Sequence, residues 1–229
     1  MALILSIETS STVCSVALHK DQHLQSYAEL QMEKSHSSHI TVMVKQVLDN
    51  AKVAIEDISA VAVSGGPGSY TGLRIGSGTA KGFCFSLDLP LIAVDTLAAM
   101  AQQVISATPN PQQFLFCPMV DARRDEVYTC LVDENLNVVL PTEPRILTSA
   151  AFAEELEKQA VIFFGSGATK AQKILTDHPN AYYIDNVMPT AKAIGELAWN
   201  KWQNKEFEDV AYYEPFYLKE VHITKPSGK

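Results

Sequence analysis

The sequence predicts an α/β protein in which one unit, a mixed central sheet flanked by helices, occurs twice. Two observations support this prediction. The order of three strands, helix, strand, helix, strand and helix is found in both halves of the chain. In both halves, a glycine-rich turn follows the fourth strand. Because a repeated order of elements indicates duplication even without sequence identity, we expect two subdomains, residues 1–108 and 109–229.

The first half begins with extended segments that short turns join into an antiparallel meander. These segments are residues 3–7, 12–18 and 24–30. Apolar residues then recur at the spacing of one helical face: Ile40, Val44, Val47, Leu48 and Ala51. This spacing predicts a helix over residues 38–52, with Ser35, Ser37 or Ser38 as its N-cap. The half ends with a strand at 60–64, a helix at 72–87, a strand at 91–94 and a helix that opens near Asp95.

The second half follows the same order. Its expected strands are residues 114–120, 126–132, 136–140, 161–164 and 182–184. Its expected helices begin at Thr148 and Ala168, and the last covers residues 190–204. Two stacked subdomains of this kind are typical of the actin-like (ASKHA, ribonuclease H-like) ATPase fold, which sugar kinases share.

Composition excludes several classes of protein. Hydrophobic residues make up 47% of the 229 residues and charged residues 19%, which is usual for a globular chain and excludes disorder. The net charge of −8 argues against a chain that binds nucleic acid without a partner protein. No apolar run approaches the roughly 18 residues of a membrane span, so we expect a cytoplasmic protein without a membrane partner. The cysteines lack C-x-x-C spacing, and we expect reduced core thiols at Cys14, Cys84, Cys117 and Cys130.

Glycine is concentrated in one region, because seven of the 11 glycines lie between residues 65 and 82. A strand that ends in glycines before a helix exposes backbone N–H groups, which suits an anion or a closely approaching backbone. The spacing fits neither the Walker nor the Rossmann phosphate loop. Gly76, Gly78, Ala80 and Gly82 place small residues along the helix, which favours close packing of another helix from this chain or from a partner.

The turn after the first strand is polar and short. In an actin-like fold a phosphate would lie at this hairpin, so we assign Glu8, Thr9, Ser10 and Ser11 as candidate nucleotide-binding residues. Four short polar residues are also usual in an ordinary turn, and both interpretations stay open.

Four segments together resemble the signature of the TsaB (YeaZ) family, and the resemblance covers essentially the whole chain. They are IETS at residues 7–10, SGGPGSYTGLRIG at 64–76, VDAR at 120–123 and PFYLK at 215–219. The resemblance implies a non-catalytic paralogue of TsaD, required with a TsaD-type transferase and a TsaE-type ATPase. Together these proteins would form threonylcarbamoyl-adenosine next to the anticodon of tRNAs that read codons starting with A.

The resemblance also implies a heterodimer with the TsaD-type paralogue, or a homodimer when the chain is isolated, with tRNA reached through the complex. Two helices from each protein would form a four-helix bundle. The residues expected at this partner interface are Ile40, Met43, Val47, Gly68, Tyr70, Thr71, Arg74, Ile75, Gly76, Thr79 and Phe83. Burial in the chain's own core is the alternative for the apolar ones.

The resemblance implies no catalytic residue, no metal and no cofactor bound catalytically, with ATP or ADP at or near the partner interface as an open option. TsaD-type proteins carry a metal-binding H-x-x-x-H, and the matching positions here are Thr96 and Met100, which do not replace an imidazole. A stand-alone actin-like ATP-dependent phosphotransferase is the main alternative, although many such kinases have aspartate at the position of Glu8. A glycoprotease-like peptidase that uses Ser69 is a further one, although no G-x-S-x-G elbow is present.

Overall fold

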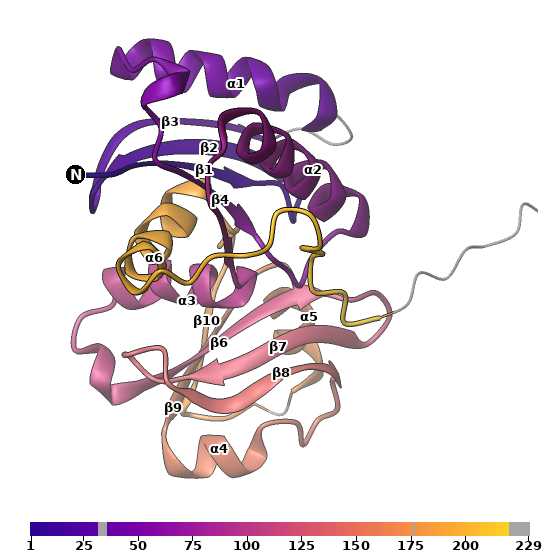
Figure 1. Cartoon of the computed structure of the whole chain (residues 1–229). Coiled ribbons are helices and arrows are strands. Elements are labelled where there is room, and N and C mark those ends of the chain that lie inside the picture. Colours follow the sequence, from indigo (N-terminus) through magenta and orange to yellow (C-terminus); the bar gives the residue numbers. More distant parts are fainter. Residues whose placement is uncertain (32–35, 176, 220–229) are drawn as a thin grey trace, which may run out of the picture.

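The computed structural model describes residues 1–31, 36–175 and 177–219, which form two stacked lobes (Figure 1). The first lobe contains the strands β1 (Leu3–Glu8), β2 (Val13–Lys20), β3 (His23–Gln31), β4 (Ala60–Ser64) and β5 (Leu91–Val94). The second contains β6 (Phe114–Asp121), β7 (Glu126–Val132), β8 (Val138–Ile146), β9 (Ala160–Phe164) and β10 (Ala181–Ile184).

The two sheets have the same topology. Their strand orders, β3-β2-β1-β4-β5 and β8-β7-β6-β9-β10, correspond strand by strand. In each sheet the first three strands are antiparallel, and the remaining two run parallel to the first. The predicted duplication of a mixed-sheet unit is therefore confirmed.

Helices cover both faces of each sheet. In the first lobe, α1 (His36–Ala51) and α2 (Tyr70–Leu87) pack side by side on one face, and α6 (Ala191–Asn204) packs on the other. In the second lobe, α4 (Ala153–Lys158) and α5 (Ala168–Ile174) cover the outer face, and α3 (Thr96–Ala107) covers the inner face. Helices α3 and α6 contact each other between the two sheets (Figure 1).

The boundary expected between residues 108 and 109 lies between the strands of the two sheets, whereas the two inner helices pack across it. Helix α3 belongs to the first half of the sequence, yet Leu97 and Met100 pack with Phe116 of the second sheet. Helix α6 belongs to the second half, yet Ile194 packs with Ile4 of the first sheet. Each lobe therefore takes one helix from the other half of the chain.

Several element ends differ from the sequence prediction. Strand β8 starts at Val138 because the turn before it places Leu136 at φ 62°, in the left-handed region. The helix expected from Thr148 starts only at Ala153, because turns precede it and Phe152, at φ 63°, is buried against Phe163.

The three N-cap candidates of the first long helix lie at different places relative to it. Ser37 and Ser38 lie inside α1 and do not cap it, and Ser35 lies outside the described residues. All four cysteines are buried and free, which confirms the expected core thiols. Within the described ranges, no helix has the length and hydropathy needed to cross a membrane.

Candidate functional site

The glycine loop, residues 65–69, lies against the first turn, residues 8–11. Parallel pairing of β1 and β4 brings the carboxyl ends of these strands to one edge of the sheet. Ser69 N donates a hydrogen bond to the Ser10 carbonyl oxygen at 2.7 Å. A Cβ atom on Gly68 would lie 2.6 Å from that same oxygen. Glycine is required here because the two backbones approach too closely for any side chain.

The first residues of α2 pack against the same turn, residues 8–11. The Ser69 side chain accepts a hydrogen bond from Gly72 N at 3.2 Å and caps the helix, which is why α2 begins at Tyr70 and not at residue 72. Thr9 Oγ1 donates to the Gly72 carbonyl oxygen at 2.8 Å. Cβ atoms on Gly72 and Gly76 would lie 2.0 Å and 2.3 Å from oxygen atoms of Thr9. These two glycines therefore serve packing inside the chain.

Glu8 is fully buried beneath this contact. Its Oε1 accepts a hydrogen bond from the Ser10 backbone N–H, and its Oε2 has no hydrogen-bond partner among the described residues. Burial raises the pKa of the Glu8 carboxyl to about 7, and interactions with Ser10 and Ser64 offset part of the rise. The carboxyl therefore keeps its proton to a higher pH than an exposed glutamate does, which lowers the cost of burying it without a cation.

The predicted nucleotide-binding residues are largely inaccessible to a ligand. Glu8 and Thr9 are 0% exposed, Ser10 is 2% exposed, and Ser11 is half-buried. The Ser10 N–H already donates to Glu8, and Ser11 Oγ accepts a hydrogen bond from Val13 N at 3.1 Å. A phosphate would reach these groups only after the glycine loop moved away. Nucleotide binding at this turn stays a prediction, and the closed geometry does not favour it.

The two positions that match the TsaD-type metal ligands contribute to packing. Thr96 Oγ1 accepts a hydrogen bond from Gly66 N at 3.2 Å, and Thr96 N donates to the Gly66 carbonyl oxygen at 2.9 Å. Met100 is fully buried, and its Cε would lie 2.5 Å from a Cβ on Gly165. In the described part of the chain, no three His, Cys, Asp or Glu side chains form a group that could hold a metal ion.

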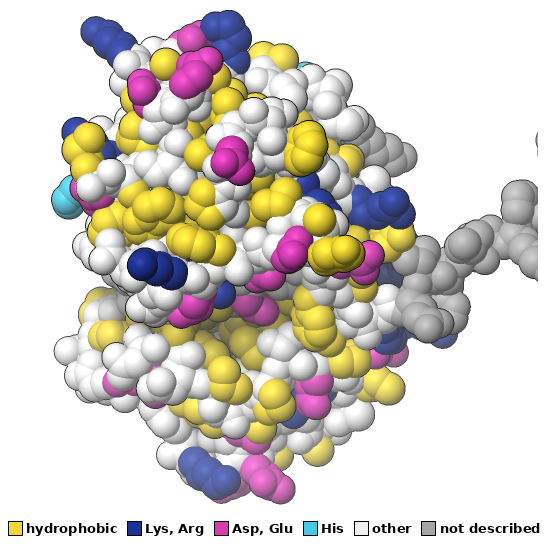
Figure 2. All heavy atoms as spheres, viewed as in Figure 1, with side chains coloured by type: hydrophobic (Ala, Val, Ile, Leu, Met, Phe, Trp, Pro, Cys, Tyr) yellow, Lys and Arg dark blue, Asp and Glu magenta, His cyan; other side chains and the backbone are white. Residues whose placement is uncertain are grey.

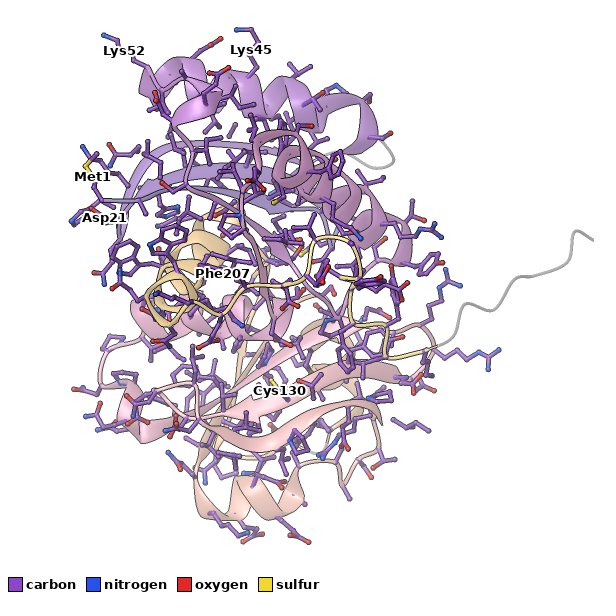
Figure 3. The ribbon with its side chains drawn as sticks, in the orientation of Figure 1. Met1, Asp21, Lys45, Lys52, Cys130 and Phe207 are labelled. Carbon is purple, nitrogen blue, oxygen red and sulfur yellow. The ribbon has the colours of Figure 1, made fainter. Side chains whose placement is uncertain are left out.

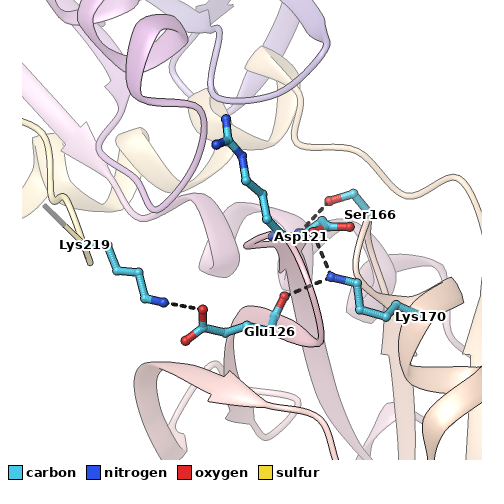
Figure 4. Close-up of polar contacts among 6 residues, drawn as sticks. Asp121, Glu126, Ser166, Lys170 and Lys219 are labelled. Carbon is cyan, nitrogen blue, oxygen red and sulfur yellow. Dashed lines mark hydrogen bonds and ion pairs between the residues drawn. The ribbon is translucent and has the colours of Figure 1, made fainter. Parts of the chain in front are cut away.

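The second glycine turn, residues 165–167, joins a polar network with the turn between β6 and β7 (Figure 4). Ser166 Oγ accepts a hydrogen bond from Asp121 N at 3.0 Å. Lys170 Nζ lies 2.9 Å from Asp121 Oδ1, and Lys219 forms an ion pair with Glu126. Each carboxylate of the network is therefore paired with a lysine, one from α5 and one from the C-terminal segment.

Part of the predicted partner interface lies in the core. The buried members are Ile40, Met43, Val47 and Gly76. The prediction is wrong for these four, because the apolar stripe of α1 packs on the sheet and Gly76 packs on Thr9. The remaining members reach the surface to different extents: Tyr70, Thr71 and Arg74 are exposed, and Gly68, Ile75, Thr79 and Phe83 are half-buried.

Sequence reasoning missed two exposed apolar side chains on α1 and α2. Phe85 on α2 is 86% exposed, and Val42 on the adjacent α1 is 62% exposed. Gly78 and Gly82 precede Phe85 on α2, and a Cβ on either would meet nothing within 4 Å. We call Thr71, Gly78, Gly82 and Phe85 the α2 ridge. Their helical spacing is the sequence signal that could have identified it.

The tail, residues 205–219, runs from α6 across both lobes (Figure 1). Phe216 N donates to the Gly65 carbonyl oxygen at 2.7 Å. Lys81 Nζ on α2 donates to the carbonyl oxygens of Ala211 at 3.2 Å and Tyr213 at 3.0 Å. These hydrogen bonds hold the tail against the glycine loop and against one side of α2.

Comparison with protein families matches residues 29–224 to the TsaD family, described as tRNA N6-adenosine threonylcarbamoyltransferase. A relative from Haemophilus influenzae, described as tRNA threonylcarbamoyladenosine biosynthesis protein TsaB, is 36% identical, with 99% of this chain and 98% of that protein covered. A protein of the same description from Bacillus subtilis is 31% identical, with 94% and 93% covered.

Solved structures agree with these matches. A Pseudomonas aeruginosa protein described as similar to peptidase YEAZ has a TM-score of 0.84 at 26% identity, covering 96% of this chain and all of that one. The activator of 2-hydroxyisocaproyl-CoA dehydratase from Clostridium difficile has a TM-score of 0.50 at 11% identity over 90% of this chain and 98% of its own, which concerns the fold alone. The actin-like fold expected from the sequence is confirmed. The chain belongs to the TsaB (YeaZ) family.

Proposed function

We propose that this chain is a non-catalytic subunit in the biosynthesis of threonylcarbamoyladenosine in tRNA. It would act in the cytoplasm with a TsaD-type transferase and a TsaE-type ATPase, on tRNAs that read codons starting with A. Membership of the TsaB family supports the pathway, and the α2 ridge supports the role of a partner subunit.

The α2 ridge is the observation that carries the proposal. Gly78 and Gly82 lie inside a long helix, where each glycine costs about 1 kcal/mol relative to alanine, and neither makes a compensating contact within the described chain. Phe85 is almost fully exposed beside them. A partner helix that packed over the two glycines would bury Phe85 and offset the cost.

The TsaD-type paralogue is the partner that fits this ridge. Because the TsaD family matches residues 29–224 of this chain, a TsaD-type protein would present an equivalent pair of helices. Helices α1 and α2 with such a pair give a four-helix bundle. A second copy of this chain would form the same bundle as a homodimer. ATP or ADP at or near this interface is part of the proposal.

Geometry gives the enzymatic alternatives less support. A phosphotransferase needs an open phosphate site, whereas Glu8 and Thr9 are buried under the glycine loop. A peptidase would need a free nucleophile, whereas Ser69 Oγ caps α2 by accepting the Gly72 N–H. The subunit role needs neither group at the surface.

Reconstitution of the modification from purified components tests the proposal. The assay would contain a TsaD-type protein, a TsaE-type protein, tRNA and threonylcarbamoyl-AMP, with this chain present or omitted. We expect modification to require the chain, which would elute with the TsaD-type protein as a heterodimer. Equal modification without the chain, and no complex, would refute the subunit role.

A matched pair of variants tests the α2 ridge. Phe85→Glu places a charge on the most exposed apolar side chain of the α2 ridge, so we expect binding to the TsaD-type protein to weaken about 30-fold or more. Ile146→Glu introduces the same charge at a side chain that is 67% exposed on the other lobe, and should leave binding unchanged. Wild-type affinity in Phe85→Glu would show that the partner binds elsewhere.

A further inference from the structure

We propose that this chain binds an RNA strand directly, along a basic groove between α2 and the tail and onto the turn between β6 and β7. The basic groove is defined by Tyr70, Arg74 and Lys81 of α2 and by Tyr217 and Lys219 of the tail, and it borders the α2 ridge at Gly78. The inference rests on the proposed function only for the identity of the RNA, which would be the tRNA substrate.

The groove has the size and the walls of a binding site. It encloses about 730 Å³. The ring centroids of Tyr70 and Tyr217 lie 4.9 Å apart, so that one aromatic pair spans from helix to tail. Tyr70 is 38% exposed and Tyr217 is half-buried, which leaves ring surface for a ligand.

Two of the three cations in the groove, Arg74 and Lys81, lack acidic partners among the described residues. The Arg74 guanidinium lies 5.4 Å from the Tyr70 ring centroid and donates to the Tyr70 hydroxyl at 2.9 Å. Lys81 donates only to the neutral carbonyls of the tail. Within the described residues neither cation forms an ion pair, and Glu214 is the one acidic side chain that lines the groove. The groove is therefore positive, although the chain carries a net charge of −8.

Lys219 connects the groove to the turn between β6 and β7 through its ion pair with Glu126 (Figure 4). At the tip of this turn lie Arg123 and Arg124, whose side chains are exposed and form no ion pair with any described residue. Figure 2 shows Lys and Arg side chains on the edge of the molecule where the described chain ends. The basic groove and the turn thus lie on one side of the molecule.

The backbone of this turn suggests that its two arginines have an external role. Arg123 and Arg124 have φ values of 70° and 50°, in the left-handed region. Such a conformation costs roughly 1–2 kcal/mol for each residue that is not glycine, and glycine and asparagine adopt it most readily. The chain carries two guanidinium groups where asparagine and glycine would cost less, and no ion pair of their side chains with a described residue offsets the cost.

Aromatic rings between cations along a groove suit a single-stranded RNA. Bases stack on tyrosine rings, while lysine and arginine contact the phosphates. A free nucleotide is too short to require the groove and the turn together. The neighbouring hollow between the tail and the glycine loop has the opposite character, because Asp95, Glu208 and Asp209 line it. Repulsion from these carboxylates would keep a polyanion on the basic groove.

Salt-dependent binding of a labelled single-stranded RNA to the full chain, followed by fluorescence anisotropy, tests the proposal. The first variant is Arg123→Asn with Arg124→Gly, which suits the left-handed backbone at both positions and should fold at least as stably as the wild type. We expect its slope of log affinity against log salt to be smaller by about 1.4, or about 0.7 for each lost phosphate contact. Tyr217→Leu should bind about tenfold more weakly, and Tyr217→Phe should keep wild-type affinity.

The charge-matched control is Lys45→Ala with Lys52→Ala. Both lysines point outward from the α1 end of the molecule, away from the tail (Figure 3). This control removes two positive charges and should keep the wild-type slope. Equal weakening by both double variants, or wild-type binding in the arginine variant, would overturn the proposal. Binding of ATP alone with the same dependence on variants, without RNA binding, would assign the groove to a nucleotide and also overturn it.

The two proposals can fail separately. If the chain proves dispensable for tRNA modification but arginine-dependent RNA binding persists, the subunit role fails and the RNA groove stands. If modification requires the chain, but the affinity of the chain and of its complex for RNA does not depend on Arg123 and Arg124, the RNA-binding proposal is refuted and the subunit role stands.

Discussion

Replacement of the buried Glu8 by glutamine should change how stability depends on pH. The pKa of this carboxyl rises from 4.5 to about 7 in the folded chain, mainly because burial disfavours the charged form. Between these values the folded state keeps a proton that the unfolded state has lost. The contribution of Glu8 to the free energy of unfolding is therefore fully present below pH 4.5 and is lost as the pH rises through about 7.

The size of the effect follows from the shift. A difference of about 2.5 pKa units corresponds to about 3 kcal/mol. Glu8→Gln keeps the shape of the side chain but does not titrate. The stability of the variant relative to the wild type should therefore rise by about 3 kcal/mol between about pH 4 and about pH 8.

Urea denaturation of both proteins across this pH range measures the difference directly. Other titrating groups, including His19, contribute equally to both proteins and cancel. A difference that stays constant within about 1 kcal/mol would refute the reasoning, because it would mean that Glu8 ionises in the folded state as it does in the unfolded chain. We also expect the variant to support tRNA modification fully, and loss of that activity would argue that Glu8 acts at an active site.

Two further predictions concern glycine packing and a second buried group. Gly72→Ala should destabilise the chain by about 1–3 kcal/mol, because its Cβ would lie 2.0 Å from the Thr9 carbonyl oxygen. Gly82→Ala should stabilise the chain by about 1 kcal/mol, because its Cβ would meet nothing within 4 Å. Thermal unfolding of both variants measures the two changes in stability, and equal shifts in the melting temperature would contradict the prediction. Burial, with a smaller contribution from the charge of Lys192, lowers the pKa of His19 to about 4, so the stability it contributes is present above pH 6.5 and is lost as the pH falls toward 4. His19→Leu should lose less stability on acidification than the wild type, which parallel urea titrations of the two proteins measure. Equal losses of stability in the two proteins would mean that His19 is protonated in the folded state.

The sequence predicted the features of this protein that short stretches of chain determine. Alternating and helical spacing of apolar residues located the strands and helices, and the repeated order of these elements indicated two similar sheets. The same kind of local signal, SGGPGSYTGLRIG at residues 64–76, supported the family resemblance. Periodicity and turn chemistry act between residues close in sequence, so both can be recognised before the chain is folded.

Tertiary structure alone decided which side chains are available to a ligand or a partner. Ile40 and Met43 looked suitable for an interface but pack on the sheet, whereas Phe85 is exposed beside two glycines without neighbours. Three further features appear only in the folded chain. They are the hydrogen bond between the glycine loop and the first turn, the packing of α3 and α6 on the sheet of the other half, and the Lys219–Glu126 ion pair. Each depends on contacts between residues far apart in sequence, because burial and close approach are set by whichever distant segment packs against a residue.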